Sequence, residues 1–168
     1  MTSAELVAIA AIDEGKYAQA FPSFGPERRG APVAAFIRVS EGPIRTREKV
    51  YHPDIVLVLD AALPQIVDVQ AGMKDGGITI LNSEMSEQEI REKFGLKGKL
   101  ALVDANKIAM EVLGLPITNT TMLGALLKAT AIVETEPLGA ALERRFGRLA
   151  DKNKAALKRA YEETIIIE

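Results

Sequence analysis

Short runs of apolar residues alternate along this chain with longer stretches that have the spacing of amphipathic helices. The predicted strands are 34–40, 55–59, 78–81 and 99–103. The second and fourth are nearly continuous apolar runs, which are typical of parallel strands buried on both faces. The apolar tail at 165–167 is expected either to pair as an edge strand or to meet another chain.

Helical periodicity and helix-start signals divide the rest of the chain. The predicted helices are 2–14, 63–67, 86–94, 105–113, 122–131, 137–146 and 150–163. A hydroxyl followed three residues later by a carboxylate predicts a capping box at Thr2–Glu5 and at Ser86–Glu89. Tyr161 is expected on the inward face of the last helix. Alternating strands and helices with short connections predict one α/β domain over residues 1–168, a layered αβα, Rossmann-like fold with a mainly parallel sheet.

The stretch from 16 to 33, KYAQAFPSFGPERRGAPV, interrupts this alternation. It contains three prolines, three aromatic residues, two glycines and the charge cluster Glu27-Arg28-Arg29. Proline fixes φ and glycine permits φ > 0, so no regular helix or strand is expected there. Loops of this length are uncommon unless they bind or cover something. The alternative is a proline-rich connection whose aromatic side chains pack on the core.

Polar residues follow or precede several of the predicted elements. Asp60 and Asp104 each end a buried strand, where open α/β sheets bind ligands, although Asp60 is at least as well explained as a turn cap. Thr118, Asn119, Thr120 and Thr121 precede an apolar helix and offer hydroxyls, an amide and backbone N–H groups to an anion. Ordinary capping by Thr118 or Asn119 is the alternative, and it is favoured by the residues alone.

A second cationic feature follows the 34–40 strand. In a short extended piece at 44–47, Arg45 and Arg47 would point the same way. Paired arginines can bind phosphate or carboxylate, but a solvated edge is the more ordinary interpretation.

Composition excludes several classes of chemistry. The 168 residues are 48% hydrophobic and 26% charged with a net charge of −2, which is ordinary for a globular chain and gives no global attraction for nucleic acid. The sequence has no cysteine, so disulfides, cysteine-ligated iron–sulfur clusters and a cysteine nucleophile are excluded. Its single histidine, His52, rules out a histidine-rich metal site and lacks partners for a triad. With no signal-like or membrane-spanning segment, a cytoplasmic protein is expected.

Three segments resemble a known family. Residues 19–32, QAFPSFGPERRGAP, resemble the signature of the gamma subunit (domain III) of 2-oxoacid:ferredoxin oxidoreductases of the pyruvate/2-oxoisovalerate type. Two more matches follow, PITNTTMLGA at 116–125 and NKAAL at 153–157. The resemblance covers essentially the whole chain in order.

The resemblance implies a subunit of pyruvate synthase, which converts a 2-oxoacid and coenzyme A to acyl-CoA and passes electrons to ferredoxin. It implies alpha, beta and delta partner subunits that carry thiamine diphosphate, Mg and iron–sulfur clusters, with none of these bound by this chain alone. The residues themselves show no constellation for catalysis by this chain alone, so no catalytic residue and no metal ligand are assigned to it. The residues assigned to coenzyme A binding or to the subunit interface are Ser23, Phe24, Gly25, Glu27, Arg28, Arg29, Asn119, Thr120 and Thr121. The alternatives are a stand-alone coenzyme A or nucleotide-binding module, and a purely structural subunit.

One departure from the family pattern concerns the beginning of the chain. Family members begin with a short strand and a glycine-rich loop, whereas this sequence opens at Met1 in the region that would follow that loop. The first strand and its loop are therefore expected to be missing, with Met1 an internal position. A chain that starts at Met1 is expected to have a gap in its core and to be unstable. A mass of 18.1 kDa for the protein from its native source would contradict this expectation.

Overall fold

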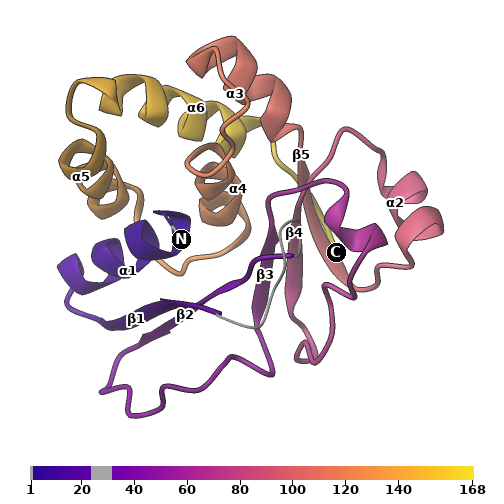
Figure 1. Cartoon of the computed structure of the whole chain (residues 1–168), viewed down its shortest axis with the longest axis horizontal. Coiled ribbons are helices and arrows are strands. Elements are labelled where there is room, and N and C mark those ends of the chain that lie inside the picture. Colours follow the sequence, from indigo (N-terminus) through magenta and orange to yellow (C-terminus); the bar gives the residue numbers. More distant parts are fainter. Residues whose placement is uncertain (1, 24–31) are drawn as a thin grey trace. The chain divides into compact units, whose positions relative to one another are not determined.

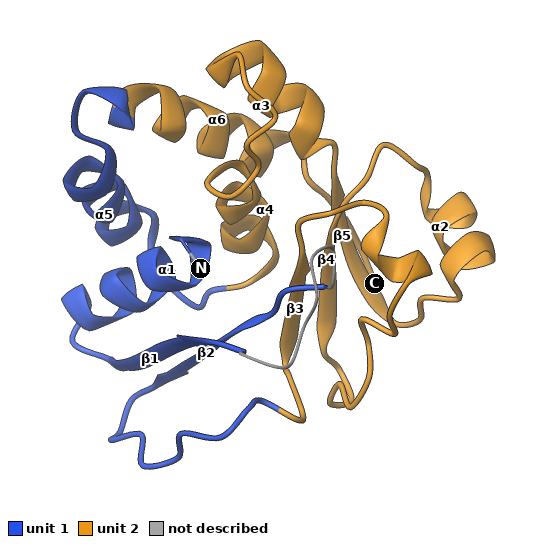
Figure 2. Ribbon diagram, in the orientation of Figure 1, with its two compact units in different colours: residues 1–50, 131–150 blue, residues 51–130, 151–168 orange. Residues whose placement is uncertain are grey.

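The computed structural model describes residues 2–23 and 32–168 (Figure 1). The chain divides into two compact units, residues 1–50 with 131–150 and residues 51–130 with 151–168 (Figure 2). Each unit contains one sheet and at least one helix that packs against it. The single domain expected from the sequence stays a prediction.

The first unit is a two-stranded hairpin covered by helices. Its elements are α1 (Thr2–Asp13), β1 (Tyr17–Pro22), β2 (Ala35–Ser40), α5 (Thr135–Phe146) and the 3₁₀ turn η2 (Gly147–Leu149). The two strands pair antiparallel, with Phe21 opposite Phe36. Helix α1 contacts both strands and α5, and its apolar side chains Leu6 and Val7 are buried. An isolated hairpin is marginal in water, so this helical cover stabilises it.

Strand β1 corrects one expectation. The stretch 16–33 was expected to hold no regular element, yet its first part forms β1. The reason is tertiary: β2, about a dozen residues further on, supplies the hydrogen-bonding partners, and a composition-based argument does not include a partner strand. Pro22 is tolerated because it occupies the last position of a strand in a two-stranded sheet, where a missing N–H costs little.

The second unit contains the larger sheet. Its strands are β3 (Ile55–Val58), β4 (Ile78–Asn82), β5 (Lys99–Val103) and β6 (Ile165–Ile167), in the order β3-β4-β5-β6. Its helices are α2 (Glu87–Phe94), α3 (Ala105–Leu113), α4 (Thr121–Ala129) and α6 (Ala150–Glu163), with the 3₁₀ turn η1 (Leu63–Gln65). The first three strands run parallel and β6 pairs antiparallel to β5. The predicted mainly parallel sheet is confirmed, as is the edge-strand interpretation of the apolar tail.

Helices cover both faces of this sheet. On one face Leu81, Leu100 and Leu102 pack with Ile90 of α2. Helix α4 contacts β4 and β5, whose alternate side chains point to the opposite face. Strand β4 is buried at all five positions. The predicted layered αβα arrangement is therefore present within the second unit.

Strand β3 departs from the expected burial on both faces. Only Val58 of its four residues is buried, and the other three are half-buried. Strand β3 pairs with β4 alone among the described strands, so it is an edge of the sheet. A continuous apolar run predicts a parallel strand correctly, but it does not say whether that strand is central.

Most helix boundaries follow the local signals. Both halves of the Ser86–Glu89 capping box are present, and α3 occupies its predicted residues. The helix expected to begin at Pro137 begins at Thr135, so the proline falls in its first turn, where it is tolerated. No strand forms at 44–47, and Tyr161 is 39% exposed rather than inward. Among the described residues, no helix has both the length and the apolar character needed to cross a membrane.

Candidate functional site

The nine residues assigned from the sequence fall in two segments. Ser23 directly follows β1, and its N–H donates to the carbonyl of Ala34 at 2.9 Å, which extends the hairpin by one pair. Asn119, Thr120 and Thr121 lie at the beginning of α4. Phe24, Gly25, Glu27, Arg28 and Arg29 lie outside the described residues. The two segments belong to different units.

The Thr120 side chain is used inside the protein. It is 1% exposed, and its hydroxyl donates to Oδ1 of Asn153 on α6 at 2.7 Å. Thr120 precedes α4 but makes no side-chain capping bond, and the carbonyl of Thr118 accepts from the N–H of Met122 at 2.9 Å. The Thr120–Asn153 bond joins two of the segments that carried the sequence resemblance, 116–125 and 153–157.

The Thr121 side chain differs from that of Thr120 in its hydrogen bonding. It is fully buried, and its hydroxyl has no hydrogen-bond partner among the described residues. A buried hydroxyl without a partner costs roughly 1–3 kcal/mol on mutational scales. A phosphate oxygen at the start of α4 would satisfy it, but the hydroxyl is enclosed in the present arrangement. Of the two hydroxyls, only that of Thr121 has a free hydrogen-bonding capacity for a coenzyme A phosphate, since that of Thr120 is already bonded to Asn153.

Gly124 brings α4 and α6 into backbone contact. A Cβ atom at this position would lie 2.0 Å from the carbonyl oxygen of Leu157 and 2.8 Å from the nitrogen of Tyr161. Only glycine permits this approach. On the same pair of helices, the Lys128 ammonium lies 5.0 Å from the centre of the Tyr161 ring, a cation–π contact. The residues 116–125 and 153–157 therefore meet along one helix–helix interface.

The carboxylates that end β3 and β5 serve local structure. Asp60 accepts from the N–H of Ala62 at 2.9 Å, and Asp104 caps α3 by accepting from the N–H of Lys107 at 3.1 Å. The turn-cap interpretation of Asp60 is thus confirmed, and Asp104 likewise caps the helix that follows it.

Asn82, at the end of β4, was not singled out from the sequence. Its amide nitrogen donates to the carbonyl of Leu59 at 2.8 Å and to Oδ1 of Asn106 at 3.2 Å, and its Oδ1 accepts from the N–H of Ala105 at 2.9 Å. This buried amide fastens the carboxyl ends of three neighbouring strands. A single polar residue after a buried strand gives no sign of such partners in the sequence.

The side chain of His52 contacts the protein backbone. Its Nδ1 lies 3.0 Å from the carbonyl oxygen of Gly72, and Asp54 forms an exposed ion pair with Lys74 at 3.1 Å. Among the described residues, neither side chain forms a hydrogen bond with a serine or threonine hydroxyl. Within residues 2–23 and 32–168, no cluster of three or more histidine, cysteine, aspartate or glutamate side chains is suited to hold a metal ion.

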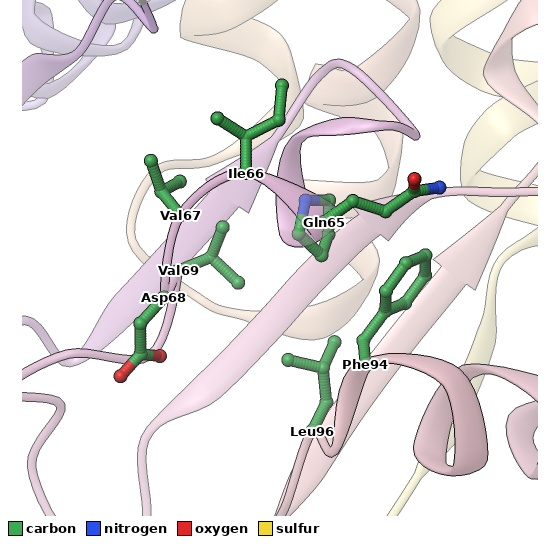
Figure 3. A pocket seen from close by; sticks show the side chains of 8 residues that line it. Gln65, Ile66, Val67, Asp68, Val69, Phe94 and Leu96 are labelled. Atoms are coloured by element: carbon green, nitrogen blue, oxygen red, sulfur yellow. The ribbon is translucent and has the colours of Figure 1, made fainter.

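A shallow pocket of about 340 Å³ lies in the second unit. Its lining consists of Pro64, Gln65, Ile66, Val67, Asp68, Val69, Phe94 and Leu96. Figure 3 shows the Phe94 ring extending toward Gln65. The Asp68 carboxylate accepts from the N–H of Gln70 at 3.0 Å, so one of the two polar side chains that line the pocket is already engaged. The lining offers apolar contact and no group of titratable side chains for catalysis.

Among the ionisable groups that the structure describes, two have shifted pKa values, and hydrogen bonds made by helix residues cause both shifts. Hydrogen bonds from the backbone N–H and hydroxyl of Ser86 lower the pKa of Glu89 in the α2 capping box. Hydrogen bonds to Glu163 and then to Glu111 raise the pKa of Arg159, which links α6 to α3. Neither group belongs to a pocket or to the assigned residues.

Comparisons with known proteins agree with the sequence resemblance. Residues 1–163 match the family model described as "Pyruvate ferredoxin/flavodoxin oxidoreductase". The chain is 54% identical over 170 aligned positions to the "Pyruvate/ketoisovalerate oxidoreductases common subunit gamma" of Thermococcus kodakarensis, covering 100% of this chain and 92% of that protein. It is 46% identical to the "Pyruvate synthase subunit PorC" of Methanothermobacter thermautotrophicus, covering 97% and 88% of the two chains.

A solved structure of a related subunit has the same fold. The crystal structure of pyruvate oxidoreductase subunit PORC from Thermotoga maritima superimposes with a TM-score of 0.86 at 37% identity, over 99% of this chain and 90% of that one. The α/β architecture with a mainly parallel sheet is therefore shared with a subunit from the same group of enzymes.

Proposed function

Because the chain belongs to the pyruvate ferredoxin/flavodoxin oxidoreductase family, we propose that it is the gamma subunit of a pyruvate (2-oxoacid):ferredoxin oxidoreductase. That enzyme converts a 2-oxoacid and coenzyme A to acyl-CoA and CO₂, and passes two electrons to ferredoxin. The observation that carries the proposal is 54% identity along the whole chain to a protein named as a common gamma subunit. A cytoplasmic location is part of the same proposal.

The chain acts in this proposal only as part of an assembly. It has no cysteine to ligate an iron–sulfur cluster, so the clusters belong to partner subunits. Thiamine diphosphate and Mg are assigned to the alpha, beta and delta partners because the family resemblance implies it. Its described residues bring together no nucleophile, base and orienting group of the kind that catalysis on the chain itself would need. Its contribution is to bind the other subunits and to help receive coenzyme A.

Two segments are proposed to carry that contribution. The first is Ser23 with Phe24, Gly25, Glu27, Arg28 and Arg29, whose arginines would make charge-assisted contacts to the thiamine-bearing subunit or to coenzyme A phosphates. The second is Asn119 with Thr120 and Thr121 at the start of α4, where backbone N–H groups favour an anion. The Thr121 hydroxyl has no partner among the described residues, but it is fully buried, so it can meet an anion only if the start of α4 opens. The internal bond of Thr120 limits that residue to a positioning role.

The test is co-purification of the native protein followed by assays of the complex. Recovery with thiamine-bearing and iron–sulfur subunits, and coenzyme A-dependent reduction of ferredoxin by pyruvate, is the expected result. Recovery of the chain alone would contradict the proposal and favour a stand-alone module.

A double variant then examines the first segment. Arg28→Ala with Arg29→Ala is expected to weaken assembly or to raise the KM for coenzyme A, since loss of one partner of a buried charge pair costs on the order of 3–5 kcal/mol. Unchanged assembly and unchanged kinetics would remove both roles from these arginines.

A further inference from the structure

One face of the hairpin carries aromatic side chains and an arginine. Side chains alternate across a strand, so Tyr17, Gln19 and Phe21 of β1 share a face with Phe36 and Arg38 of β2. The two phenyl rings lie 5.6 Å apart, and the Arg38 guanidinium lies 5.8 Å from the Phe21 ring. The opposite face carries only small or branched apolar residues, which suits the packing of α1.

Arg38 is held in a fixed position on this face. Its Nη1 donates to Oε1 of Gln19 at 3.3 Å, and its Nη2 donates to the carbonyl of Lys49 at 3.0 Å. The second bond fastens the exposed segment 45–49 beside the hairpin. The guanidinium has five N–H donors, and these two bonds leave others for a further acceptor.

The segment fastened by Arg38 adds more positive charge. Residues 32–50 contain four cationic side chains, Arg38, Arg45, Arg47 and Lys49, and two acidic ones, Glu41 and Glu48, in a chain whose net charge is −2. Arg45, Arg47 and Lys49 are exposed, and none of them forms an ion pair with another described residue. Tyr17 is 49% exposed on the same side of the hairpin as Arg38.

We propose that Tyr17, Arg38, Arg45, Arg47 and Lys49 form a docking surface, here called the basic face, for an acidic surface of another subunit of the oxidoreductase. Aromatic residues and arginine are the side chains most enriched in the energetic centres of protein interfaces, and lysine and arginine at a rim steer an acidic partner. The local positive charge on a net-negative chain selects an acidic partner over a second copy of this protein, which would present the same basic face. This inference rests on the proposed function.

The experiment uses the complete complex, reconstituted from its subunits, and measures the dissociation constant of the gamma chain over a series of salt concentrations. The test variant is Arg45→Glu with Arg47→Glu, because both side chains are exposed and neither forms a hydrogen bond or ion pair with another described residue. The matched control is Arg145→Glu with Arg148→Glu, which changes the charge equally at two exposed positions of the same unit, on α5 and η2 rather than on the hairpin or segment 45–49. Thermal unfolding of the free subunit verifies that each variant is folded.

The test variant is expected to weaken subunit binding about tenfold at low salt and to reduce its salt dependence, with the control unchanged. Tyr17→Ala is expected to weaken binding without changing the salt dependence. Unchanged binding in both test variants, or an equal loss in the control, would overturn the proposal. A raised KM for coenzyme A with normal subunit binding would also overturn it, because the basic face would then be a ligand site. If the wild-type chain itself fails to join the complex, the proposed function fails together with this inference.

Discussion

The helix pair α4–α6 and the β1–β2 hairpin both include residues of the segments that identified the family, but they use their polar side chains differently. In the helix pair, the Thr120 hydroxyl bonds to Asn153 and Gly124 admits the backbone of α6, so these residues are enclosed. In the hairpin, Tyr17 is half exposed and Arg38 is fixed beside an exposed basic segment. The family segments 116–125 and 153–157 therefore form an internal contact between helices, whereas Tyr17 and Arg38, which lie outside segment 19–32, belong to the surface that we propose binds a partner.

The largest effect is expected at Gly124. Gly124→Val would place side-chain atoms against the carbonyl of Leu157, which lies 2.0 Å from the position of a Cβ. Because backbone cannot move aside as a flexible side chain can, we expect a loss of about 3 kcal/mol in the free energy of unfolding, measured by chemical denaturation. Gly42→Ala is the control, since a Cβ there meets nothing within 4 Å. Equal stability of both variants would show that α4 and α6 do not touch at Gly124.

Smaller changes in the free energy of unfolding are expected when Thr120 or Thr121 is replaced by valine, and the two changes have opposite signs. Thr120→Val leaves Oδ1 of Asn153 without the donor it has in the native protein, so we expect a loss of roughly 1–3 kcal/mol in the free energy of unfolding. Thr121→Val removes a buried hydroxyl that has no described partner and is expected to stabilise the free chain by about 1 kcal/mol.

The Thr121→Val variant also tests whether Thr121 contributes to coenzyme A binding. If the Thr121 hydroxyl meets a coenzyme A phosphate in the complex, Thr121→Val raises the KM for coenzyme A although the free chain is more stable. An unchanged KM would mean that Thr121 contributes nothing to the ligand. Destabilisation by Thr121→Val would show instead that its hydroxyl has an internal partner.

The smallest effect is expected at the α2 capping box, where stability is set by local sequence. Ser86→Ala is expected to cost about 0.5 kcal/mol near neutral pH. The folded-state pKa of Glu89 lies below its ordinary value of 4.5, so its stabilising contribution is present above pH 4.5 and is lost as the pH falls. The difference between wild type and Ser86→Ala in urea denaturation should therefore shrink below pH 4.5. A difference that does not change with pH would show that Glu89 is not coupled to this cap.

Much of the fold could be predicted because its signals are local. The Ser86–Glu89 box, the α3 residues and the apolar strand runs depend on neighbours within four positions along the chain, and each was located correctly. Strand β1 was missed because its partner is β2, about a dozen residues away. Tyr161 was expected inward from helical periodicity, but its ring is 39% exposed and lies in a cation–π contact with Lys128.

The candidate site was predictable only in part, for the same reason. Thr120 and Asn153 are separated by 33 positions in the chain, and nothing in either segment indicates that one hydroxyl is bonded and its neighbour is not. Likewise, Arg38 and Lys49 have no local pattern in common, and the bond between them exists only in the folded hairpin.

The order of the amino acids was enough to indicate the family, the alternation of strands and helices, the mainly parallel sheet and the exclusion of cysteine chemistry. These follow from residue identities and from local patterns of apolar positions, which act along the chain. Four other features are defined only in the folded chain. Strand β3 is an edge, Gly124 is a contact between helices, Thr120 has a partner that Thr121 lacks among the described residues, and Arg38 lies beside an exposed segment. Burial and hydrogen-bond pairing depend on groups brought together from distant positions, and only the folded chain defines those neighbours.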